Sequence, residues 1–77
     1  MTPSETLDLK GLKCPLPALM AKKALARLKP GQSIAVIADD PLAHLDIPHM
    51  CRTEGYEVVE VVREDSGARL LLRRPSL

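Results

Sequence analysis

Residues 12–17 read Leu-Lys-Cys-Pro-Leu-Pro and lead directly into an alanine- and lysine-rich run that extends to Lys29. Proline suits the first turn of a helix, where backbone amides have no intrahelical partner. We therefore predict a helix in which Pro15 is the first residue, Pro17 is the third and Cys14 is the N-cap. This position places the sulfur at the positive end of the helix dipole, which favours a thiolate and can lower a thiol pKa from about 8.5 to as little as about 3.5.

Two interpretations of Cys14 stay open on the residues alone. Free cysteine is among the most buried residue types, so Cys14 can be a small core residue that happens to cap a helix. Cysteine is a poor N-cap, however, and its position before two prolines suggests that the sulfur itself is needed. Lys10 and Lys13 are close to it in sequence; they either raise the local potential and help a partner to dock or are ordinary solvated residues.

The flanking segments indicate alternating strands and helices. Residues 5–9 alternate polar and apolar side chains, as in a short half-buried strand, and Lys10-Gly11 then forms a turn. Residues 33–38 are almost continuously apolar, which is typical of a central strand that pairs in parallel with the first. Between them, the helix is predicted to run from Pro15 to about Lys29 and to end at Pro30-Gly31. Its apolar arc comprises Leu16, Met20, Ala21, Ala24, Leu25 and Leu28. Leu19 lies at the flank of this arc, where packing is favoured over contact with a partner.

The central part of the chain contains paired acids and a proline-led helix start. Asp39-Asp40-Pro41 resembles a catalytic pair, but an Asx-type turn is the better interpretation. We expect Asp46 to cap the second helix and Pro48 to occupy its first turn, because an interior proline costs about 3 kcal/mol. This helix is predicted to end at Gly55.

Residues 56–63 and 69–73 read as two strands joined by a hairpin turn at 64–67. The predicted order is βαβαββ, and so short a chain can form only two layers. We therefore predict a single α+β domain over residues 1–77, with its core in about 5–74. The expected architecture is a two-layer α/β sandwich, with a four-stranded mixed sheet and two helices on one face.

Composition excludes several classes of protein. The net charge is +1 and 27% of residues are charged, which argues against a dedicated nucleic-acid or membrane-surface binder. No apolar run approaches the roughly 20 residues of a membrane span, and no secretory h-region follows Met1. Two cysteines form neither a disulfide framework nor a zinc set. We expect a cytoplasmic monomer with reduced thiols and no metal or cofactor.

The second cysteine, the two histidines and the last two arginines are each expected to have a structural role or to be solvated, and not to react. Cys51 is expected to be a core or half-buried residue and not a resolving thiol. His44 and His49 are five positions apart, which is the wrong spacing for one helix face, so a metal site formed with a cysteine is disfavoured. Arg73 and Arg74 either add to the basic surface near Cys14 or, as we favour, are simply solvated.

From Leu7 to Arg74 the chain resembles the TusA/SirA family of small sulfur-carrier proteins. The segments that carry this resemblance are residues 9–17, which contain Cys-Pro-Leu-Pro, together with 29–31, 38–41, 46–48, Cys51, Gly55 and 72–74. The resemblance implies a fold like the C-terminal domain of translation initiation factor 3 and a persulfide on Cys14. One departure is Met50, because relatives often have an aromatic residue before the second cysteine, whereas the lone aromatic residue here is Tyr56.

Three functions are consistent with these observations. The first is a sulfurtransferase carrier, supplied by a cysteine desulfurase or another sulfur donor and serving a downstream acceptor protein. Such exchange requires an exposed, partly ionised cysteine and no general base. The second is a thiol-redox regulatory or binding module in which Cys14 and Cys51 form a reversible disulfide. The third is an RNA-binding module, by fold analogy alone, which the near-neutral charge disfavours. The residues do not choose among tRNA thiolation, sulfur oxidation, molybdenum-cofactor sulfur supply and selenium metabolism as the pathway.

Overall fold

The computed structural model of the protein describes residues 3–76. Its elements follow the predicted order βαβαββ. They are β1 (Glu5–Asp8), α1 (Leu16–Arg27), β2 (Ser33–Ala38), α2 (Ala43–Glu54), β3 (Glu57–Glu64) and β4 (Gly67–Arg73).

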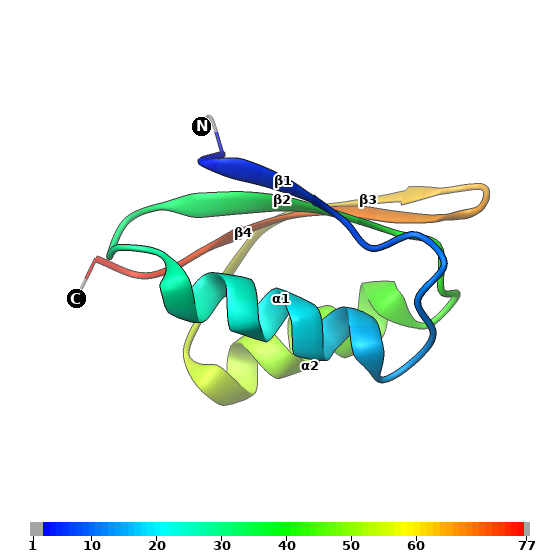
Figure 1. Ribbon diagram of the computed structural model, residues 1–77, viewed down its shortest axis with the longest axis horizontal. Helices are drawn as coiled ribbons and strands as arrows, with labels where there is room; N and C mark the ends of the chain where they lie inside the picture. The colour runs from blue at the N-terminus through cyan, green and yellow to red at the C-terminus, as the bar shows by residue number, and fades with distance from the viewer. Residues whose placement is uncertain (1–2, 77) are drawn as a thin grey trace.

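The four strands form one mixed sheet in the order β1-β2-β4-β3. β1 runs parallel to β2, while β2 and β3 both pair antiparallel with β4. Both helices lie on the same face of this sheet (Figure 1). The predicted two-layer sandwich is confirmed, and so is the central position of the apolar strand β2.

The core lies between the sheet and the helices and is almost entirely aliphatic. β2 and β4 contribute Ile34, Val36, Leu70 and Leu72, each 0% exposed, because their alternate side chains point toward the helices. The helices contribute Ala21, Ala24 and Leu25 from α1, with Leu28 directly after it, and Ala43, Ile47, Met50 and Cys51 from α2. Leu9 closes one end of this core, and Leu12 packs against it from the loop before α1.

The start of α1 differs from the prediction. Pro15 is the N-cap, Leu16 is the first helical residue and Pro17 is the second, so Cys14 lies one residue outside the cap. The helix also ends at Arg27, two residues earlier than predicted. Leu16 and Met20 were expected in the buried arc, but they are 45% and 38% exposed. In so small a domain the sheet and α2 cover only part of the circumference of α1, which leaves this flank open.

The start of α2 was also predicted wrongly. The helix begins at Ala43, so Asp46 lies inside its first turn and Pro48 is an interior residue. Pro48 has no N–H to donate to the carbonyl of His44, which weakens the helix locally. Ala43 and Ile47, on the N-terminal side of Pro48, are 1% and 0% exposed. Their burial against the sheet offsets this cost, because tertiary packing contributes most of the stability of protein helices.

One end of the molecule gathers several connecting segments. The loop before α1, the turn between β2 and α2 and the β3–β4 hairpin all lie there, opposite the C-terminus (Figure 1). The hairpin approaches the β2–α2 turn so closely that a Cβ at Gly67 would clash with the carbonyl oxygen of Ala38. Glycine is therefore required at this contact. This end of the fold brings Cys14 next to residues that are distant in sequence.

Candidate functional site

Two aspartates hold the loop that carries Cys14. Asp39 accepts a hydrogen bond from the Gly11 N–H through Oδ1 at 2.9 Å. Asp40 accepts the Cys14 N–H through Oδ2 and the Leu42 N–H through Oδ1, the latter at 3.0 Å. Asp40 is only 6% exposed, and these donors satisfy both of its oxygens. The two acids are therefore structural, as predicted, and they fix the backbone on which Cys14 is presented.

The Cys14 thiol is exposed and lies beside a third carboxylate. Sγ donates a hydrogen bond to Oδ2 of Asp46 at a distance of 3.0 Å. The sequence prediction gave Asp46 only a capping role and did not place it at this site. Because β1 and β2 are parallel, α1 and α2 begin at the same end of the sheet. That topology was itself predicted, so it could have indicated that residues at the two helix starts meet.

These neighbours raise the pKa of the Cys14 thiol, whereas its position at a helix start predicted a lowered pKa. The hydrogen bond to Asp46 is the main cause, followed by partial desolvation and by the negative charges of Asp46 and Asp40. A helix start carries only about half of a positive charge, while a carboxylate at hydrogen-bond distance carries a full negative one. The carboxylates therefore prevail, and the thiol keeps its proton at rest.

A groove between the two helices opens beside the sulfur. It has a volume of about 360 Å³. α1 and its preceding loop contribute Cys14, Pro15, Ala18, Leu19 and Lys22, and α2 contributes Asp46, His49, Met50, Thr53 and Glu54. Lys22 and Glu54 form an ion pair across the groove, with 3.3 Å between Nζ and Oε2. Cys14 and Asp46 thus lie two helical turns away from this ion pair, toward the start of both helices.

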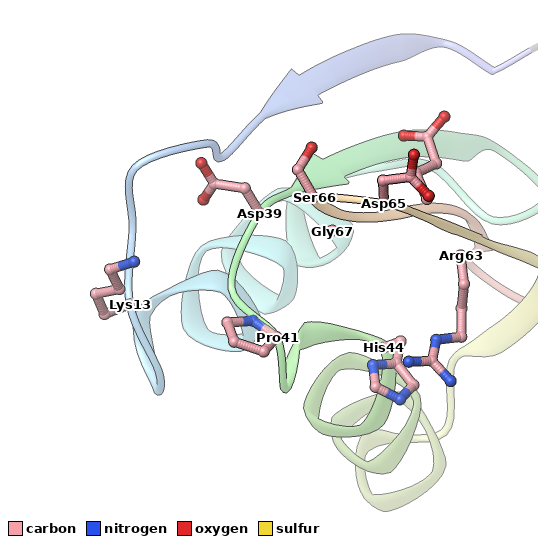
Figure 2. Close-up of a pocket in the computed structure, with 9 residues that line it drawn as sticks. Lys13, Asp39, Pro41, His44, Arg63, Asp65, Ser66 and Gly67 are labelled. Carbon is pink, nitrogen blue, oxygen red and sulfur yellow. The ribbon is translucent and has the colours of Figure 1, made fainter.

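The other predicted site residues are placed differently. Pro15 lines the groove, while Pro17 is buried beneath the first turn of α1. Lys13 is exposed and lines a separate hollow of about 400 Å³ next to the β3–β4 hairpin. Figure 2 shows Lys13 at one margin of this hollow and His44 and Arg63 at the opposite margin. Lys10 is exposed in the turn, where its backbone N–H donates to Oδ1 of Asp8. Neither lysine is among the residues that line the groove beside Cys14.

Comparison with known proteins identifies the family. The family model described as sulfurtransferase TusA matches residues 5–74. The chain belongs to this family. Its fold is similar to the crystal structure of the SirA-like protein from Desulfitobacterium hafniense, with a TM-score of 0.73 and 31% sequence identity. That match covers 90% of this chain and 93% of the other. The predicted resemblance to the TusA/SirA family is thereby confirmed, and membership indicates a general role in sulfur transfer.

The second cysteine of this TusA-family chain is a core residue, as expected. Cys51 is 0% exposed on the inner face of α2. Burial raises the pKa of its thiol to about 11, with Arg52 acting weakly in the opposite direction. A resolving thiol has to be accessible and ionisable, and Cys51 is neither. The structure therefore does not favour a Cys14–Cys51 redox pair.

The two histidines lie in different surroundings. His44 lines the hairpin hollow and His49 lines the groove. Across residues 3–76, no three His, Cys, Asp or Glu side chains gather in a way that could hold a metal ion. In the same residues, no helix has the length and apolar character to cross a membrane.

Arg73 and Arg74 have structural partners away from Cys14. Arg73 donates to both carboxylate oxygens of Glu57 at 2.8 Å. Arg74 donates to the carbonyl oxygens of Ala26 and Leu28 at the C-terminal end of α1. They are therefore neither simply solvated nor part of the surface near Cys14. Their contacts hold the end of β4 in place at the end of the molecule opposite Cys14.

Proposed function

We propose that the protein is a sulfur carrier that accepts sulfane sulfur as a persulfide on Cys14 and passes it to an acceptor thiol. The observation that carries this proposal is an exposed thiol at the mouth of the α1–α2 groove, in a chain of the sulfurtransferase TusA family. The hydrogen bonds from Gly11 and Cys14 to Asp39 and Asp40 support it, because they hold the backbone of the loop in place while the sulfur stays exposed.

Loading is a thiol exchange at the outer sulfur of a donor persulfide. The Cys14 thiolate attacks that sulfur, the sulfur–sulfur bond of the donor breaks, and the donor cysteine leaves as a thiolate. The proton lost by Cys14 goes to the departing donor. The transferred atom remains at the oxidation level of sulfane sulfur, so the step needs no external oxidant or reductant.

Delivery reverses the roles. An acceptor thiolate attacks the outer sulfur of the Cys14 persulfide, and Cys14 leaves as a thiolate. Cys14 then regains a proton and its hydrogen bond to Asp46, which returns the carrier to its resting state. Because the resting thiol is protonated and the thiolate is the nucleophile, reaction with passing disulfides or oxidants is slow between transfers.

We propose that the donor is a cysteine desulfurase or another persulfide-bearing protein and that the acceptor is a downstream protein thiol. The pathway is tRNA thiolation or another sulfur relay. The proposed carrier acts in the cytoplasm as a monomer, without a cofactor, a metal ion, a membrane or direct contact with nucleic acid. Pro15 and Pro17 are proposed to orient the sulfur, and Lys10 and Lys13 are proposed to assist docking from the outer side of the loop.

The decisive experiment is intact-mass measurement after incubation with a cysteine desulfurase and cysteine. We expect the native chain and Cys51→Ala to gain one reducible sulfur atom, and Cys14→Ser to gain none. Peptide mapping should place the added atom on Cys14. Sulfur found on Cys51, or equal labelling of Cys14→Ser, would show that the proposal is wrong.

A further inference from the structure

The charges around Cys14 are unbalanced. Its thiol donates to Asp46, and its backbone N–H donates to Asp40. Over residues 3–76, the ion pairs are Lys22–Glu54 and Arg73–Glu57, so no lysine, arginine or histidine nitrogen of this part of the chain lies within 4.0 Å of the Asp46 carboxylate. The sulfur therefore faces two carboxylates without a paired cation.

The nearby cations do not compensate for this charge. Lys13 lines the hairpin hollow (Figure 2) and not the groove beside Cys14. Lys22 is paired with Glu54 further along the groove. His49 lines the groove, but its ring nitrogens form no ion pair within 4.0 Å of the Asp46 carboxylate. A positive charge beside the sulfur has to come from a visiting molecule.

We propose that the Cys14 site selects a sulfur donor that carries a positive charge next to its reacting sulfur, and that Asp46 is the residue that selects it. This inference rests on the proposed function and specifies its donor: a protein segment with a lysine or arginine close to its persulfide cysteine. On docking, that cation becomes the partner of Asp46 in place of the Cys14 thiol. The thiol then loses its main stabilising contact and is free to ionise and attack.

The place of Asp46 limits how far the cation can be from the donor sulfur. Asp46 Oδ2 lies 3.0 Å from Cys14 Sγ, the atom that attacks the donor sulfur. A cation that pairs with Asp46 therefore lies within several ångströms of the reacting sulfur. Because an extended segment rises about 3.3 Å per residue, a lysine or arginine on the same segment reaches this position from within a few residues of the donor cysteine.

Three small disulfides of different charge test the proposal without any partner protein. They are cationic cystamine, neutral bis(2-hydroxyethyl) disulfide and anionic 3,3′-dithiodipropionate. In each reaction the Cys14 thiolate attacks one sulfur, a mixed disulfide forms and the other half leaves as a thiol. Rates are measured at pH 8 and low salt and divided by those of neutral N-acetylcysteine amide, which removes the intrinsic reactivity of each probe.

We expect the normalised rate of the native chain to be about tenfold higher with the cationic than with the anionic probe, as Coulomb's law gives for charges several ångströms apart near a surface. Asp46→Asn should reduce this ratio by about threefold or more. The ratio is unaffected by a general rise in thiolate fraction, because the same thiolate meets all three probes. Asp65→Asn is the matched control: it removes one carboxylate at the hairpin hollow and should leave the ratio unchanged.

A native chain without charge preference, or an Asp46→Asn variant with the native ratio, would overturn the proposal. A salt series on the native chain provides a test that needs no variant, because raising NaCl from about 20 mM to about 500 mM should shrink an electrostatic preference. A ratio that does not change with salt also contradicts the proposal.

The disulfide assays transfer no sulfane sulfur, so they test the selection by Asp46 separately from the carrier function. Failed persulfide loading with an intact charge preference therefore refutes the carrier function, whereas normal loading with no preference refutes only the selection by Asp46.

Discussion

The two cysteines of this chain show how the same side chain acquires different properties from its surroundings. The pKa of both thiols is raised, but the causes differ: the Asp46 hydrogen bond acts on exposed Cys14, and burial acts on Cys51. Burial can be relieved only by opening the fold. A contact with a carboxylate can be relieved by a visiting molecule. Cys14 is therefore inactive but available, while Cys51 is inactive and inaccessible.

The largest expected difference is in the rate of alkylation. With iodoacetamide at pH 8, Cys14 should react at least about 10³ times faster than Cys51, because modification of Cys51 requires an opening of the fold that costs several kcal/mol. Timed quenching followed by peptide mass analysis measures both rates in one sample. In urea above the unfolding transition the two rates should converge. Comparable rates in the native chain would contradict the burial of Cys51.

The two cysteines should also differ in how far a serine substitution lowers the free energy of unfolding. Cys51→Ser places a hydroxyl in the apolar core and should lower the free energy of unfolding by about 1–3 kcal/mol. Cys14→Ser is the matched control, since it makes the same change at an exposed site and should cost less than about 0.5 kcal/mol. Urea unfolding followed by far-ultraviolet circular dichroism measures both. A larger loss for Cys14→Ser would assign the loop thiol a structural role.

Removing the carboxylate beside Cys14 should shift its ionisation. Asp46→Asn eliminates the main cause of the raised pKa, so the pH midpoint of Cys14 alkylation should move down and the rate at pH 7.5 should rise. The pH profile of the iodoacetamide rate measures this shift, with Asp65→Asn as the control. An unchanged midpoint would mean that the Sγ–Oδ2 contact has no effect on the proton.

A last expected effect, seen only at alkaline pH, is the pH dependence of stability contributed by Cys51. An unfolded cysteine ionises near about 8.5, whereas the folded one ionises at about 11. The stability that the neutral buried thiol contributes is therefore complete below pH 8.5 or so and is lost as the pH rises through the folded pKa. Between pH 8 and pH 10.5, the urea midpoint of the native chain should fall relative to the urea midpoint of Cys51→Ala. A constant difference would show that Cys51 ionises alike in both states.

The sequence by itself determined the order of elements and their main partners. The apolar run 33–38 predicted the central strand β2, and the Cys-Pro-Leu-Pro element predicted where α1 begins to within one residue. Alternation in 5–9 and the turn residues at 64–67 predicted β1 and the hairpin correctly. These features are local, since they depend on proline and glycine conformation and on the periodicity of apolar residues. The structural roles of Asp39 and Asp40 and the burial of Cys51 were predicted on the same basis.

Only the tertiary structure decided the environment of the sulfur. Local rules placed Pro48 in the first turn of α2 and assigned Cys14 a lowered pKa, and both predictions were wrong. Burial of Ala43 and Ile47 against the sheet extends α2 toward its N-terminus and brings Asp46 to 3.0 Å from the sulfur. The hydrogen bond between Cys14 and Asp46 joins residues that are 32 positions apart in the sequence. The ionisation of a thiol depends on the charges within a few ångströms in space, and in this chain the closest of them comes from the neighbouring helix.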